Sequence, residues 1–240
     1  MVESLIPIER ELFLLLNSPH TPFLDAFFYC ISQAQVWIVF GLVLIALLSY
    51  RQKVGEVVCL LVMLGLLILI TDQISSGIFK PFFQRLRPTH HPATEDVVKT
   101  VLDYKGGMYG FISSHAANFM AAGIFLSLVV RNRWFTFAII FLMLTVSYSR
   151  IYLGVHFVTD VLGGLLLSVV TAPLVYFLYR KTREVFLQIP FPETDTPYLT
   201  PLEDRRKMIT FSVWVFYLSM LIISPALIHL YSTNFFASRI

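Results

Sequence analysis

Seven residues with charged or reactive side chains gather within 81 positions of an otherwise apolar sequence. They are three cations, two histidines, a hydroxyl and a carboxylate: Lys80, Arg87, Ser113, His115, Arg150, His156 and Asp160. Ionisable groups beside membrane-spanning segments are costly unless they have partners, so this cluster predicts a working site. Cations hold an anion, and histidines transfer protons or attack, so we expect the anion to be a phosphate.

The composition predicts a polytopic membrane protein. Of the 240 residues, 57% are hydrophobic and 14% are charged, and the mean hydropathy is +0.73. Soluble domains have about 25% charged residues and could not bury so much apolar surface. The net charge of +3 is spread among loops, so we expect no nucleic-acid partner.

Six apolar segments approach or exceed the roughly 20 residues that a membrane span needs. They are residues 25–49, 54–78, 113–131, 134–152, 156–179 and 209–231. The third and fourth are separated only by the region of Asn132, which predicts a tight helical hairpin. The expected fold is all-α, a membrane helical bundle of six transmembrane helices.

An amphipathic helix is expected before the first span, too short to cross a membrane. Its apolar positions have helical spacing and comprise Leu5, Ile8, Leu12, Leu15 and Leu16. Glu9, Arg10 and Glu11 lie between them, which predicts an interfacial helix on the membrane surface. The alternative is a soluble-type helix packed on a loop. The expected organisation is an interfacial helix (1–24), a membrane core (25–180), a cytoplasmic loop (181–208), and a further span with a tail (209–240).

Basic residues near the ends of the spans predict the orientation. One side of the membrane collects ten and the other eight, and three of those eight are candidate site residues. The side with ten is therefore expected to be cytoplasmic. Lys80, His115, Arg150 and His156 then lie at outer helix ends, so the chain is expected in the inner (plasma) membrane with its site on the extracytoplasmic side.

Lys80 and Arg87 bracket one short turn. Pro81 suits the first turn of a helix, and Pro88 disfavours helix at Arg87. Both cations can therefore converge on one anion, with Arg87 supplying a planar donor fork. The alternative is a basic patch that binds lipid head groups.

Ser113, Ser114 and His115 open the third span. Serines are good N-caps, and free N–H groups at a helix start form an anion site. His115 would be placed there to protonate a leaving oxygen. The alternative is a simple cap beside an interfacial histidine.

His156 and Asp160 are four residues apart, so on a helix they would share one face. A carboxylate on one ring nitrogen fixes the tautomer and leaves the other nitrogen free to attack. The alternative is a purely structural hydrogen bond. Arg150 precedes this pair by six residues.

These stretches carry a family resemblance over roughly residues 72–165. Lys80 with Arg87-Pro88 matches a K-x6-R-P pattern. Ser113-Ser114-His115 resembles a P-S-G-H element, and Ser149-Arg150 begins a match to S-R-x5-H-x3-D. The chain thereby resembles the type 2 phosphatidic acid phosphatases, which are lipid phosphate phosphatases related to vanadium haloperoxidases. It departs from the pattern where Ile112 replaces a proline and Ser114 a glycine.

The resemblance implies a role for each candidate residue. His156 would be the nucleophile that forms a phosphohistidine, oriented by Asp160, and His115 would be the general acid. The remaining members would bind phosphate: Lys80, Arg87, Ser113, Ser114 and Arg150. Sites of this family need no metal or other cofactor, and the sequence contains no metal-ligand cluster.

The function expected from the resemblance is hydrolysis of a membrane lipid phosphate or diphosphate. The compact six-span form resembles bacterial enzymes that recycle undecaprenyl diphosphate, which is the favoured substrate. Phosphatidylglycerophosphate and lipid A are the alternatives, and a relative could pass phosphate to an acceptor other than water. A non-catalytic lipid-phosphate binding or transport protein is the alternative of another class. The sequence does not indicate an oligomeric state.

Overall fold

The computed structural model describes residues 3–50, 52–188 and 203–237, and every regular element in that part of the chain is a helix. After a 3-10 turn (η1, Glu3–Leu5) come α1 (Ile6–Asn17), α2 (Pro22–Ile31), α3 (Ala34–Ser49) and α4 (Val54–Asp72). The π-helix η2 (Gln73–Phe79) and α5 (Lys80–Phe83) continue α4. They are followed by α6 (Ser114–Val130), α7 (Arg133–Tyr152), α8 (Val158–Phe186) and α9 (Glu203–Ala237). The predicted all-α fold is confirmed.

The long helices have the length and composition of membrane spans. Among the described residues, 54–83, 133–152, 158–186 and 206–229 each form a helix that is apolar enough to cross a membrane. The α2–α3 pair makes a fifth span if its two helices count as one, and α6 is a shorter apolar helix of 17 residues. All six predicted segments are helical, but length and composition establish only four or five spans.

The first predicted span, 25–49, is broken. Ser32 ends α2, with its hydroxyl donating to the carbonyl of Tyr29 at 2.8 Å, and Gln33 is extended. The two helices meet at a bend of 60°. Ser32, Gln33 and Gln35 interrupt the apolar run at this point, but hydropathy averaged over the length of a span does not register a polar stretch of a few residues.

The predicted α6–α7 hairpin is confirmed. Arg131 ends α6 in the left-handed region, with a φ of 50°. Asn132 then caps α7, where its side chain accepts from the N–H groups of Trp134 and Phe135, both at 3.0 Å. An asparagine cap satisfies N–H groups that would otherwise lack partners, so the chain reverses within two residues.

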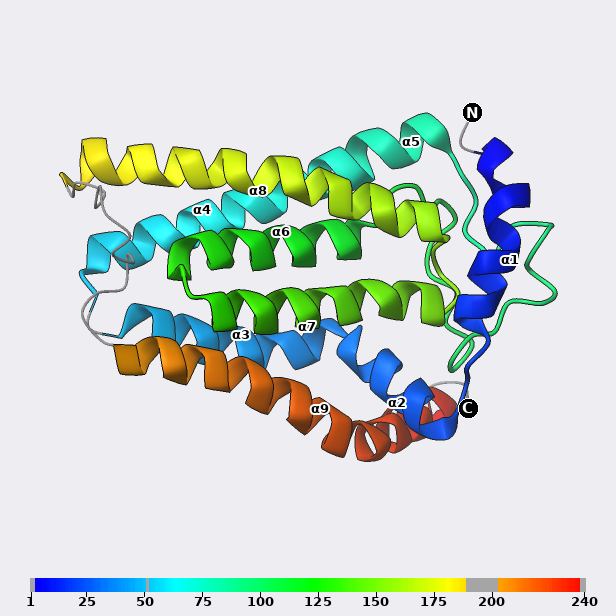
Figure 1. Ribbon diagram of the computed structural model, residues 1–240. Helices are drawn as coiled ribbons and strands as arrows, with labels where there is room; N and C mark the ends of the chain where they lie inside the picture. Colours follow the sequence, from blue (N-terminus) through cyan, green and yellow to red (C-terminus); the bar gives the residue numbers. More distant parts are fainter. Residues whose placement is uncertain (1–2, 51, 189–202, 238–240) are drawn as a thin grey trace.

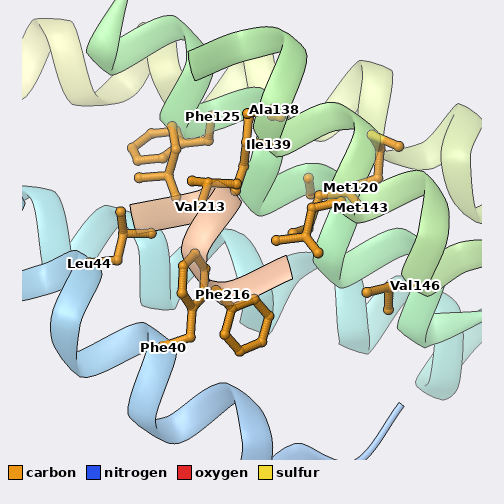
Figure 2. Packing of buried hydrophobic residues seen from close by; sticks show 14 of the residues in the cluster. Phe40, Leu44, Met120, Phe125, Ala138, Ile139, Met143, Val146, Val213 and Phe216 are labelled. Carbon is orange, nitrogen blue, oxygen red and sulfur yellow. The ribbon is translucent and has the colours of Figure 1, made fainter. Parts of the chain in front are cut away.

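α6 occupies the centre of the bundle, packed against α4, α7 and α8 (Figure 1). At Gly164 of α8, a side chain would meet the carbonyl of Ser113 at 2.6 Å, so glycine allows α8 to approach α6 closely. Figure 2 shows the apolar core that α6 and α7 share with α3 and α9, including Phe40, Phe125 and Phe216.

α1 lies across the end of the bundle, beside the end of α7 and the start of α8 (Figure 1). It buries Ile6, Glu9, Phe13 and Asn17 against the protein. Asn17 fixes its end, because the side chain amide donates to the carbonyl of Tyr152 at 2.7 Å. A long loop, residues 84–113, connects α5 to α6. Much of the predicted loop 181–208 (residues 189–202) lies outside the described residues.

Candidate active site

The sequence-predicted cations and histidines meet at the end of the bundle that α1 covers. The charges of Arg87, Arg150 and Lys80 all act on the ring of His156, and His115 is close enough to do the same. These residues come from the start of α5, the loop after it, the start of α6, the end of α7 and the α7–α8 connection. The structure therefore brings together side chains that are up to 76 residues apart in the chain.

His156 and Asp160 are in contact, but they do not share a helix face as the spacing predicted. α8 begins at Val158, so His156 lies in the connection before it. Asp160 is in the first turn, where its Oδ2 accepts the N–H of Phe157 at 3.0 Å and lies 3.4 Å from Nδ1 of His156. Helix capping therefore aims the carboxylate at the ring, and the other ring nitrogen, Nε2, is left for chemistry.

The surroundings of His156 keep its ring neutral. The residue is 2% exposed. Burial, followed by the charges of Arg87 and Arg150, holds the pKa of His156 well below its ordinary value of 6.5. A neutral imidazole has the lone pair that a nucleophile needs.

Arg87 and Arg150 are buried cations whose side chains are held in place by hydrogen bonds. Nε of Arg87 donates to the carbonyl of Tyr109 at 3.1 Å, and Nη2 of Arg150 donates to the hydroxyl of Tyr104 at 3.2 Å. Nε of Arg150 has no hydrogen-bond partner in the part of the chain that the structure describes. Buried guanidinium groups with free N–H bonds are suited to a planar, multiply charged anion.

Lys80 is held by the serine that departs from the family pattern. Its Nζ donates to the hydroxyl of Ser114 at 2.8 Å and to that of Ser76 at 3.3 Å. The π-helix η2 brings Ser75 to the same point, where its hydroxyl donates to that of Ser114 at 2.9 Å. The hydroxyl of Ser114 thus fixes the lysine rather than facing outward.

Ser113 is buried, and its hydroxyl caps the start of α6. It accepts the N–H of Ala116 at 3.4 Å, and the N–H of Ser113 donates to the carbonyl of Asp160 at 2.9 Å. This bond joins the start of α6 to the first turn of α8. The backbone of Ser32, at the α2–α3 break, hydrogen-bonds the ring of His115.

Three residues that the sequence did not single out contact the carboxylate of Asp160 or its neighbours. Nη1 of Arg85 donates to Oδ1 of Asp160 at 2.8 Å and to the hydroxyl of Thr159 at 2.6 Å. Nη2 of Arg85 pairs with Glu9 of α1. In the sequence, Glu9 belongs to the polar face expected for this helix. Its spacing from Ile6, Phe13 and Asn17, the other buried residues of α1, is the pattern that could have identified it.

Comparisons with known proteins agree with this arrangement. The family described as the PAP2 superfamily matches residues 56–184. The lipid A 4'-phosphatase of Porphyromonas gingivalis is 38% identical over 226 residues, which cover 94% of this chain and 95% of that protein. The lipid A 4'-phosphatase of Bacteroides thetaiotaomicron is 33% identical over 184 residues, covering 75% and 81%.

A solved structure has the same fold. The crystal structure of a transmembrane PAP2-type phosphatidylglycerolphosphate phosphatase from Bacillus subtilis aligns with a TM-score of 0.55 and 20% identity, covering 76% of this chain and 89% of that one. The family match spans more than half of the 240 residues and contains every candidate site residue. The chain therefore belongs to the PAP2 superfamily and is a multi-pass membrane lipid phosphatase.

Proposed function

We propose that this phosphatase removes the 4'-phosphate of lipid A at the extracytoplasmic face of the inner membrane. The observation that carries the proposal is the alignment with a lipid A 4'-phosphatase over 94% of the chain, which reaches well beyond both ends of residues 56–184. The undecaprenyl diphosphate favoured by the sequence analysis has no such support, whereas its lipid A alternative does. The excess of basic residues at the opposite helix ends supports the orientation.

In the proposed mechanism, Nε2 of His156 attacks phosphorus and the bond from phosphorus to the sugar oxygen breaks. His115 gives its proton to that oxygen, which leaves as a hydroxyl. A water molecule, deprotonated by His115, then attacks the phosphohistidine, releasing inorganic phosphate and free His156. Asp160 stabilises the positive charge that the imidazole carries in between.

The cations of the site would hold the phosphate oxygens throughout. Arg87, Arg150 and Lys80 place positive charge around the position where negative charge develops. The N–H groups of Ser114 and His115 at the start of α6 would add donors, because the first N–H groups of a helix have no partner within it. In this scheme the side chains and backbone supply the whole phosphate cage.

The test is a substrate panel with the purified full-length enzyme in proteoliposomes. Lipid A labelled separately at its 1- and 4'-phosphates is compared with phosphatidylglycerophosphate and undecaprenyl diphosphate. We expect release of the 4'-phosphate, retention of the 1-phosphate, and the highest kcat/KM for lipid A. A higher kcat/KM for either other lipid, or removal of the 1-phosphate alone, would overturn the substrate assignment.

A further inference from the structure

A buried ionic cluster lies on the oxygen of Asp160 that does not face His156. Oδ1 accepts from Nη1 of Arg85 at 2.8 Å, while Oδ2 faces the ring. Arg85 and Asp160 are both 0% exposed, and Glu9 is 6% exposed. A buried charge is costly without partners, so each of these groups depends on the next.

Glu9 completes this cluster from a distant part of the chain. It pairs with Nη2 of Arg85 and accepts the N–H and the hydroxyl of Thr159, at 3.0 and 2.9 Å. The guanidinium of Arg85 also lies over the ring of Phe157, 4.7 Å from its centroid. The fork of Arg85 is thus fixed on both sides, and α1 is joined to the first turn of α8.

The net charge of the cluster suits the proposed reaction. With both carboxyl groups ionised, Asp160 and Glu9 carry two negative charges against the one positive charge of Arg85, so one negative charge remains beside His156. The imidazole becomes positive when it attacks phosphorus. Burial makes the attraction between these charges stronger than it would be in water. If Glu9 were neutral, Arg85 would cancel the charge of Asp160.

We infer that Glu9 and Arg85 are positioning residues for the His156–Asp160 pair. Arg85 orients the carboxylate of Asp160, and Glu9 orients Arg85 and keeps the cluster negative. The inference rests on the proposed phosphohistidine mechanism, but not on the identity of the lipid.

The first test compares Glu9→Gln with Glu11→Gln, which removes the same charge from the exposed Arg10–Glu11 pair on the same helix. The substrate is dioctanoyl phosphatidate, a minimal lipid phosphate. We expect Glu9→Gln to lower kcat roughly 10- to 100-fold, the usual effect of losing a group that orients a catalytic ligand. KM should change less than about twofold, because the phosphate-binding cations are untouched. An unchanged kcat, or an effect confined to KM, would overturn the inference.

The second test asks whether Glu9 acts through Asp160. In an Asp160→Asn background, Glu9→Gln should lower the residual kcat no further, because the group that it orients has lost its charge. If Glu9→Gln lowered kcat by the same factor in both backgrounds, Glu9 would act on the fold as a whole, and the inference would be overturned.

Arg85→Lys provides a variant that keeps the charge but lacks the two-sided fork. We expect a lowered kcat with vanadate inhibition retained, and full kcat would contradict the role of Arg85. Failure of both Glu9→Gln and Arg85→Lys to fold would assign the pair to stability and overturn the inference. If the His156→Ala enzyme were active, the proposed mechanism itself would be wrong. If His156→Ala were inactive while the Glu9 and Arg85 variants kept full kcat, only the positioning role would be wrong.

Discussion

At the scale of single residues, the position of Arg87 depends on a glycine opposite it. Gly106 has a φ of +68°, and a side chain there would collide with Nη1 of Arg87. Gly106→Ala should therefore strain the loop and displace the guanidinium. Since a misplacement of about 1 Å can cost about 100-fold in rate, we expect kcat/KM to fall roughly 10- to 100-fold.

Gly107 is the matched control for this substitution. A side chain there would meet nothing within 4 Å. Steady-state hydrolysis of dioctanoyl phosphatidate should separate the two variants, with Gly107→Ala close to the unchanged enzyme. Equal activity of the two alanine variants would show that Gly106 does not position Arg87.

The neutral ring of His156 predicts a pH profile. Because burial, Arg87 and Arg150 lower the pKa of His156 below 6.5, the ring stays neutral as the pH falls through that value. The acid limb of kcat/KM due to this group should therefore lie below pH 6.5. Arg87→Gln removes one of the charges that lower the pKa, so the limb should move upward.

The measurement is kcat/KM against pH for both proteins on one substrate, whose own ionisation is the same in each. The other ionisable groups that act on the ring, Lys80, Arg150 and His115, also remain the same. A limb that stays in place, or moves to lower pH, would contradict the assignment of His156.

Residue types and spacing predicted the cations and histidines that meet at the site, but not Arg85 and Glu9, which pair with each other beside Asp160. Lys80, Arg87 and Arg150 are unusual at apolar helix ends, so the sequence alone identified them as candidate site residues. Glu9 is not unusual on an amphipathic helix. Its partner Arg85 is 76 residues away, and only the tertiary fold brings the two together.

At the scale of elements, α1 presents an apolar stripe away from the protein. Ile8 is 79% exposed and Leu15 is 67% exposed, while Glu9 on the opposite side is buried. This pattern supports the predicted interfacial position, because a stripe of this kind is stable when it is inserted at the membrane surface.

Charges on this stripe should affect the enzyme only where a bilayer is present. We expect Ile8→Glu with Leu15→Glu to lower hydrolysis of long-chain lipid phosphates in proteoliposomes severalfold and to leave that of dioctanoyl phosphatidate in detergent unchanged. Glu11→Gln is the control. Equal rates of the double variant and the control in proteoliposomes would contradict the interfacial position of α1.

The helix boundaries show which features at this scale the sequence did not predict. The break at Ser32 depends on local hydrogen bonding within an apolar run, which hydropathy does not register. The start of α8 at Val158 depends on the capping of Phe157 by Asp160. By contrast, Asn132 is a strong cap between two apolar runs, so its hairpin could be predicted.

At the scale of the whole molecule, apolar side chains face outward along the helices, and the charged residues of the candidate site are buried at one end of the bundle. Leu166, Val170 and Ile222 are each more than 65% exposed, whereas Arg85, Arg150 and Asp160 are at most 2% exposed. This distribution suits a bilayer around the helices and a water-accessible head-group site at one face.

The predicted orientation can be tested with single cysteines at opposite ends of the bundle. Val97→Cys lies in the loop near the site, and Trp134→Cys lies at the start of α7; both positions are exposed. A membrane-impermeant maleimide applied to spheroplasts should label Val97→Cys, and should label Trp134→Cys only after lysis. The native Cys30 and Cys59 are buried, so the unsubstituted protein gives the background. The reverse labelling pattern would contradict the orientation.

The central claim is that His156 carries the phosphoryl group during turnover. The most direct measurement is rapid acid-free quenching of the enzyme with radiolabelled lipid phosphate, followed by mapping of the labelled peptide. We predict an acid-labile, base-stable phosphoryl group on His156, absent from His156→Ala, which should retain no measurable turnover. Label on another residue, or turnover by His156→Ala at the normal rate, would contradict the claim.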